Sequence, residues 1–180
     1  IITIDLANDN AALGADLDAQ MSLNNIVKTG THLIRVEVGG GPAMPVDISN
    51  VVGLHNLGTV SLNSATNDVT MTTAQAVGFG TVSVVGSIDV TDLQNNTAAD
   101  LSNITSTGGH EAASIDSGGG VTFTGDLGNF ALDVVGNGTL TIDASVAHGK
   151  TVLAATNETI VVSGVTSSDE YNLSGLTAPG

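Results

Sequence analysis

Short bursts of strict alternation recur along the chain, with an apolar residue at every second position and mostly Ser, Thr, Asp or Asn between. A strand with one buried face has this period of two, because successive side chains point to opposite faces. Turn formers such as Gly136-Asn137-Gly138 follow the bursts. The apolar pairs of the bursts are Val60/Leu62, Val69/Met71, Val82/Val84, Ile88/Val90, Val121/Phe123, Leu140/Ile142 and Ile160/Val162. The pattern predicts many short, half-buried strands.

The bursts are evenly spaced in the second half of the chain. One series has steps of 19 and then 20 (140−121, 160−140): Val121, Leu140 and Ile160. A second series interleaves with it in steps of 20 and then 19 (152−132, 171−152): Leu132, Val152 and Tyr171. Two strands in each unit of about 20 residues favour a two-sided β-solenoid, whose coils bury their apolar side chains only against neighbouring coils.

The expected fold is therefore all-β, a β-solenoid or β-helix-like ladder, and the alternative is an antiparallel β-sandwich. Aromatic residues make up only 2% of the chain and Trp is absent, which favours a thin core of stacked aliphatic side chains. The earlier half is less regular. Val60, Val82 and Ile104 have steps of 22 (82−60, 104−82), so we expect insertions or a different packing there.

The segment 1–45 differs from the remainder of the chain. Residues 2–5 and 32–38 alternate as strands, residues 11–27 have spacings of a short helix or an irregular segment, and Gly39-Gly40-Gly41-Pro42 ends the second strand. Solenoids need atypical ends, because an uncapped end exposes apolar side chains and unpaired backbone. We predict an N-terminal cap or opening strands over 1–45 and a repetitive β domain over 46–180.

The charge balance restricts the partners. Lys28, Arg35 and Lys150 oppose 18 acidic residues, and the formal net charge is -15, which disfavours nucleic acid and anionic membranes and favours cations. No apolar run approaches the roughly 18 residues of a membrane-spanning helix. Cys is absent, which excludes disulfides and zinc-thiolate sites. With so few Lys and Arg, this composition favours an extracellular or cell-surface location.

Acidic residues beside Gly or Ser at strand ends are the candidate metal ligands. Calcium takes six to eight oxygen ligands, so a stack of acidic turns predicts calcium as the one candidate cofactor. Asx turns need the same residues for backbone hydrogen bonds, and this alternative stays open. The candidate calcium ligands are Asp89, Asp92, Asp116, Asp126, Asp143 and Asp169.

The remaining motifs give weaker indications of function. The four histidines, His32, His55, His110 and His148, lack metal-ligand spacing and are expected to be isolated surface residues. The chain has no Gly-x-Ser-x-Gly elbow, so we expect no serine hydrolase. Asn-x-Ser/Thr sequons permit N-glycosylation. They begin at Asn95, Asn103, Asn137, Asn157 and Asn172.

Three segments carry a family resemblance: Leu140-Thr141-Ile142-Asp143-Ala144-Ser145, Val161-Val162-Ser163-Gly164-Val165 and Asn172-Leu173-Ser174-Gly175-Leu176. They resemble the degenerate repeats of bacterial surface-layer proteins and of repeats-in-toxin adhesins, and the likeness covers about residues 46–176. In those families similar strands form calcium-stabilised β-solenoids that assemble outside the cell. The resemblance implies the same for this chain.

We expect a structural subunit of an extracellular assembly, a surface layer or a filament, which self-associates through β edges or faces. An adhesin or phage-fibre module that binds a glycan is the alternative, although few aromatic rings are present to stack on sugars. A carbohydrate-active enzyme using Asp116 or Asp143 is the third hypothesis. Three basic residues do not furnish a groove for acidic sugars, so we expect no catalysis.

Overall fold

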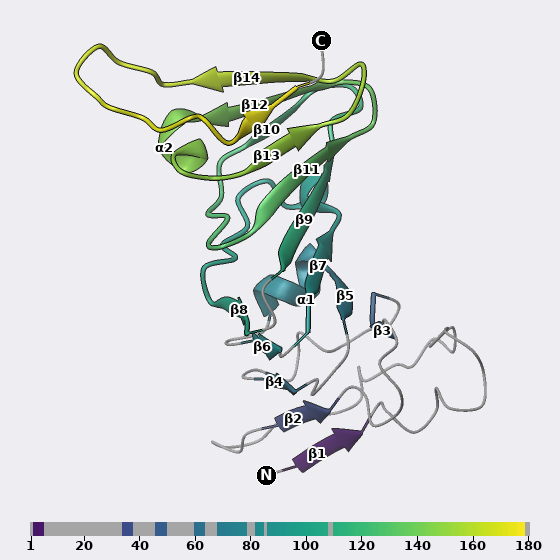
Figure 1. The fold of residues 1–180 in the computed structure, drawn as a ribbon. Coiled ribbons are helices and arrows are strands. Elements are labelled where there is room, and N and C mark those ends of the chain that lie inside the picture. Colours follow the sequence, from purple (N-terminus) through teal and green to yellow (C-terminus); the bar gives the residue numbers. More distant parts are fainter. Residues whose placement is uncertain are drawn as a thin grey trace. The chain divides into compact units, whose positions relative to one another are not determined.

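The structure, a computed structural model, describes residues 2–5, 34–37, 46–49, 60–63, 68–78, 82–84, 86–107 and 110–178. These residues form short strands in parallel sheets with few helices, so the predicted all-β class is confirmed at this level (Figure 1). The chain divides into two compact units. The first comprises residues 1–90 and 103–111, and the second comprises residues 91–102 and 112–180.

Parallel strand pairs build the first unit. Its elements are β1 (Ile2–Asp5), β2 (Ile34–Glu37), β3 (Val46–Asp47), β4 (Val60–Asn63), β5 (Val69–Thr72), α1 (Thr73–Gly78), β6 (Val82–Val84), β7 (Ile88–Thr91, of which Thr91 falls in the second unit) and β8 (Ile104–Ser106). The strand orders are β1-β2-β4, β3-β5-β7 and β6-β8. Val82 pairs with Ile104 in parallel despite the step of 22 residues, and β4 contacts β6.

Alternation decides burial in the first unit wherever side chains are described. Val69, Met71, Ile88 and Val90 are buried, while Asp89 between the last two is exposed. A buried glutamine in α1 fastens the helix to its neighbours. The Gln75 side chain accepts a hydrogen bond from the Thr72 amide at 2.9 Å and donates to the Ile48 carbonyl at 2.7 Å.

The second unit consists of two parallel sheets. Its elements are η2 (Leu93–Asn95), β9 (Glu111–Asp116, of which Glu111 falls in the first unit), β10 (Val121–Phe123), β11 (Ala131–Val135), β12 (Thr139–Asp143), α2 (Ala144–Ala147), β13 (Val152–Ala154), β14 (Thr159–Ser163) and β15 (Leu176–Thr177). One sheet has the order β10-β12-β14, and the other contains the order β9-β11-β13-β15. Consecutive strands of this unit therefore alternate between the two sheets (Figure 1).

The strand registers confirm most of the predicted spacing. Val121 pairs with Leu140, and Leu140 pairs with Ile160, as the first series predicts. In the other sheet, Leu132 pairs with Val152 as predicted. The third member of this series was wrong, however, because Val152 pairs with Leu176 rather than with Tyr171. The connection over residues 164–175 is longer than the earlier ones, and it carries Tyr171 away from the ladder.

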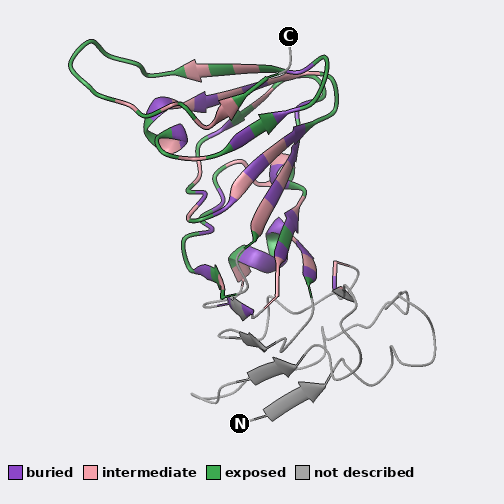
Figure 2. Cartoon of the chain, viewed as in Figure 1, coloured by how far each residue is buried: buried purple, intermediate pink, exposed green. Residues whose placement is uncertain are grey.

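Both sheets bury one parity of their side chains in a common core. Leu132 and Val134 in β11 are buried, as are Leu140 and Ile142 in β12 (Figure 2). Phe123 is also fully buried, although most of this core is aliphatic. The predominance of aliphatic side chains in the core agrees with the low aromatic content.

Some predictions fall outside the described residues or were missed. The strands predicted near residues 2–5 and 32–38 are present as β1 and β2, which pair in parallel. The helix or irregular segment predicted over residues 11–27 lies outside the described residues, and the boundary at residue 45 stays a prediction. Neither α1 nor α2 was predicted, since each is short and directly follows a strand.

Candidate functional site

Half of the candidate calcium ligands lie at chain reversals that share one geometry. In each of these Asx turns, the Oδ1 atom of Asp or Asn accepts a hydrogen bond from the backbone amide two residues later. The pairs are Asp47 and Ser49 at 2.8 Å, Asp100 and Ser102 at 2.9 Å, Asp116 and Gly118 at 2.8 Å, Asp126 and Gly128 at 2.8 Å, Asp143 and Ser145 at 2.9 Å, and Asn172 and Ser174 at 3.2 Å. Turn chemistry therefore accounts for these side chains.

The Asp143 turn also begins a helix and stacks on the next strand of its sheet. Asp143 is the N-cap of α2, and its Oδ1 accepts a second hydrogen bond from the Ser145 hydroxyl at 2.6 Å. That hydroxyl bond and the backbone bond lower the pKa of Asp143 below 3.8, since both favour the carboxylate. Gly164 lies beside this carboxylate with a φ of +71°, which L side chains rarely adopt, so the position favours glycine.

The six candidate ligands are not brought together. Asp116, Asp126 and Asp143 serve separate Asx turns, while Asp89 is exposed within β7. Asp92 is exposed with a positive φ of 65°, and Asp169 accepts hydrogen bonds from Thr166 and Tyr171. In the described part of the chain, no three His, Asp or Glu side chains form a group that could hold a metal ion. Calcium stays a prediction.

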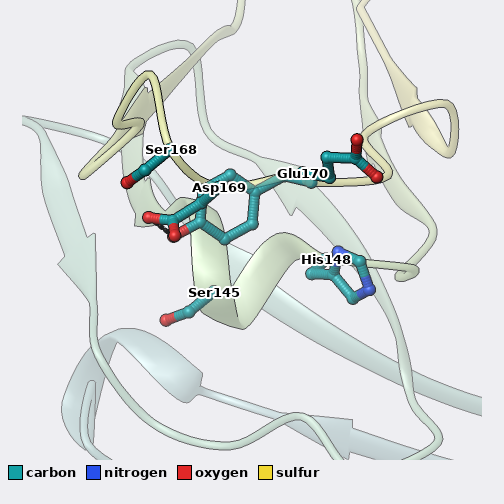
Figure 3. A pocket seen from close by; sticks show the side chains of 6 residues that line it. Ser145, His148, Ser168, Asp169 and Glu170 are labelled. Atoms are coloured by element: carbon teal, nitrogen blue, oxygen red, sulfur yellow. Dashed lines mark hydrogen bonds between the residues drawn. The ribbon is translucent and has the colours of Figure 1, made fainter.

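A pocket of about 440 Å³ lies between α2 and the connection from β14 to β15. Its lining consists of Ser145, His148, Ser168, Asp169, Glu170 and Tyr171 (Figure 3). The Tyr171 hydroxyl donates to Asp169 at 3.2 Å, and its ring meets the His148 ring edge-on at 6.2 Å between centroids. The Asn172 amide donates to Nδ1 of His148 at 3.0 Å, which fastens the connection to the end of α2.

The pocket is electronegative. Partial burial of Tyr171 raises its pKa most, followed by its hydrogen bond to Asp169 and by the charges of Asp169 and Asp143. Glu170 adds a further carboxylate to the lining. Lys150 is the described cation nearest to these residues in the sequence, and its Nζ donates a hydrogen bond to the Gly128 carbonyl. The pocket therefore offers hydroxyl groups, carboxylates and one phenol ring to a ligand.

The outer strand of the β10-β12-β14 sheet exposes apolar side chains. The burial of Ile160 and Val162 in β14 is only intermediate, whereas their partners Leu140 and Ile142 in β12 are fully buried. Val161 is 43% exposed, and Val165 beyond the strand is 59% exposed. Within the described residues, β14 is the last strand of its sheet and its second edge makes no ladder. This edge is the main candidate for contact with another chain.

Among the described residues no helix combines the length and apolarity needed to cross a membrane. His110 and His148 are exposed, in agreement with the expected surface histidines, whereas His32 and His55 lie outside the described residues.

Comparison of the chain with protein-family models, with curated proteins and with solved structures finds no match in any of the three. The turns, the pocket and the edge strand are the structural features on which a proposed function can be based.

Sequence reasoning missed the pocket, whereas it left Asx turns open as the alternative to calcium. The pocket joins Ser145 and His148 to residues 168–171, which only the folded connection brings near them. The turns had a readable local signal, because Asp or Asn stands two residues before Ser at Asp100, Asp143 and Asn172. That spacing is typical of Asx turns and would have separated them from metal ligands.

Proposed function

We propose that the chain is a structural subunit of an extracellular surface layer or filament, that it is folded as a β-solenoid, and that it associates with copies of itself through strand edges. The proposal assigns it no catalytic activity. The composition and the resemblance to surface-layer and repeats-in-toxin repeats support the location outside the cell. The pairing and burial of the second unit support the architecture and the mode of association.

The parallel ladders favour a solenoid over an antiparallel sandwich. Strands that are consecutive in the chain lie in different sheets, and three successive strands of each sheet pair in register at a nearly constant separation along the chain. A sandwich of the type considered pairs its strands antiparallel, whereas these pairs are parallel. A coil that climbs one rung every about 20 residues has this arrangement.

The observation that carries self-association is the unprotected edge of β14. Natural proteins block strand edges with Lys, Pro, bulges or covering segments, because free backbone groups pair with other strands. The segment Thr159–Ser163 has the sequence TIVVS, without a charged residue or Pro, and Val161 is exposed at its centre. Such an edge is expected to be covered in the assembly.

A second copy of this chain is the proposed occupant. The formal net charge of -15 makes charged faces of two copies repel, so that copies associate best through an uncharged segment such as β14. Pairing of β14 with β14 of the other copy closes a dimer, whereas pairing with a different edge propagates a filament. Both outcomes use the same edge, and particle size distinguishes them.

Charge placed on the edge strand tests the proposal. Val161→Lys should abolish oligomers in sedimentation velocity and filaments or sheets in electron microscopy, because a lysine blocks strand addition. The matched control is Leu153→Lys, since Leu153 is also 43% exposed but lies on β13, between β11 and β15. It should leave assembly intact. A wild-type chain that stays monomeric with calcium and with a chelator contradicts the proposal.

The pocket beside Tyr171 favours one second function, a glycan-binding module. Hydroxyl and carboxylate groups bind sugar hydroxyls, and an aromatic ring packs against the apolar face of a sugar. On a glycan array, the wild-type chain should retain a defined glycan and Tyr171→Ala should lose it. If the wild-type chain retains none, the pocket has no such role.

A further inference from the structure

We propose that Asn157 and Asn137 form an N-glycan acceptor pair on one edge of the second unit, with Asn157 as the principal acceptor. The two asparagines occupy equivalent turns. Val134 pairs with Ala154 before the turns, and Thr139 pairs with Thr159 after them, so the turns have equal length. Both asparagines have a positive φ, 56° at Asn137 and 74° at Asn157, and both are exposed.

Within the described residues, the side chains of this pair make no hydrogen bond, in contrast to that of Asn172. In the sequon at Asn172, Oδ1 of Asn172 already accepts hydrogen bonds from the Ser174 amide at 3.2 Å and from the Ser174 hydroxyl at 2.8 Å. That bonding holds both groups that a glycosyltransferase recognises in a sequon.

The remaining two sequons have hydrogen bonds at the threonine, through its hydroxyl at Asn103 and through its backbone carbonyl at Asn95. At Asn103, the Thr105 hydroxyl donates to the Val82 carbonyl at 3.4 Å. At Asn95, the Thr97 carbonyl accepts hydrogen bonds from the Thr124 and Gly125 amides at 2.8 and 3.1 Å, which joins that turn to the segment directly after β10. Of these two, only the Asn103 sequon has its hydroxyl occupied; the Asn95 sequon is bonded through its backbone alone, as is the Asn157 sequon, where the Thr159 amide donates to the Gly138 carbonyl at 2.9 Å.

Exposure ranks the two members of the pair. Thr159 is exposed and lies on β14, the last described strand of its sheet, whereas Thr139 is half-buried on β12 between two neighbouring strands. The hydroxyl needed for sequon recognition is therefore more accessible beside Asn157. Asn157 should be modified first.

The chemistry is a transfer from a lipid-diphosphate-linked oligosaccharide. The amide nitrogen of Asn157 forms a bond to the anomeric carbon of the first sugar, and the bond from that carbon to the diphosphate oxygen breaks. Lipid diphosphate leaves, and the amide nitrogen loses one proton. No oxidant or reductant is consumed, and the enzyme with its donor supplies everything that the chain lacks.

Crowding should limit the pair to one glycan. Adjacent parallel strands lie about 4.8 Å apart, and the turns that follow such strands start from the same separation. Two oligosaccharides rooted on adjacent rungs would overlap near their first sugars. A glycan on Asn157 should therefore reduce modification of Asn137.

The experiment exposes the folded chain to an oligosaccharyltransferase and a lipid-diphosphate oligosaccharide, and peptide mapping by mass spectrometry gives the occupancy of each sequon. Five synthetic sequon peptides correct for the intrinsic preference of the enzyme. After this correction, Asn157 should exceed Asn103 and Asn172 several-fold, and Asn157→Gln should raise the occupancy of Asn137 several-fold.

Two results would overturn the inference: equal corrected occupancy at Asn172 and Asn157, or no modification of Asn137 or Asn157 when their peptides react. Frequent double modification of the pair would overturn the crowding step. The inference does not depend on self-association, because a monomeric chain serves equally well as the acceptor. Failure of one proposal therefore leaves the other standing.

Discussion

The two units use the same kind of parallel pairing with very different spacing along the chain. In the second unit, in-register partners from β9 to β14 have steps of 19 or 20, as from Val121 to Leu140 (140−121) and from Leu132 to Val152 (152−132). In the first unit, the steps are 32 from β1 to β2 (34−2), 26 from β2 to β4 (60−34) and 23 from β3 to β5 (69−46). Pairing therefore tolerates connections of variable length.

Comparison of the two units separates the effect of strand alternation from that of connection length. Burial alternates within strands of both units, as at Val69 and Met71 or at Leu140 and Ile142. The step between paired strands is nearly constant only from β9 to β14 of the second unit. Strand parity thus determines which side chains enter the core, and constant turn length makes the ladder visible as a period in the sequence.

Removal of a ladder side chain from the regular unit should have the largest effect. Leu140 is fully buried between Val121 and Ile160, so Leu140→Ala should lower the free energy of unfolding by about 2–5 kcal/mol. The control is Leu153→Ala, because Leu153 is 43% exposed and should lose less than about 0.5 kcal/mol. Urea denaturation measures both. Equal losses would show that alternation does not determine burial here.

The sequence predicted the strands better than it predicted the spacing between them. Every predicted burst formed a strand, because alternation is local and needs only the residues of that strand. The spacing failed at Tyr171, where residues 164–175 add length without a change in composition that would reveal it. Leu176 takes the ladder position instead.

The candidate site was less predictable than the fold. The aspartates were correctly placed at strand ends in several cases, but their function depends on which atoms they meet. Oδ1 of Asp143 meets the amide and hydroxyl of Ser145, two residues away, and this contact alone explains its position. The pocket depends on residues 168–171 folding against α2, which no local pattern encodes.

Removal of one turn carboxylate should have an intermediate, pH-dependent effect on stability. The folded pKa of Asp143 lies below its ordinary value of 3.8, so the stabilisation is fully present above about pH 4 and is lost as the pH falls through the folded pKa. Asp143→Asn keeps an oxygen acceptor, as Asn172 does naturally, but removes the titrating group. Its melting temperature should therefore fall less steeply between about pH 5 and about pH 2.

Asp133→Asn is the control for Asp143→Asn, because Asp133 lies on β11 and its side chain makes no hydrogen bond within the described residues. It removes one charge without changing an Asx turn. The slope of melting temperature against pH should remain close to that of the wild-type chain. If the two variants have the same slope, the Asp143 turn does not contribute to acid sensitivity.

Insertion into the long connection should have the smallest effect on stability. It tests whether connection length is constrained in the second unit. A short Gly-Ser-Gly-Ser segment placed after Val165 lengthens a connection that already departs from the period, and doubling a flexible loop costs only about 0.6 kcal/mol. The same insertion after Asn137 would separate β11 from β12, where Gly138 closely approaches Ser117. Thermal unfolding should show a small shift for the first variant and a much larger loss for the second. Equal losses would mean that connection length is constrained throughout the second unit, and the irregular spacing of the first unit would then need a different explanation.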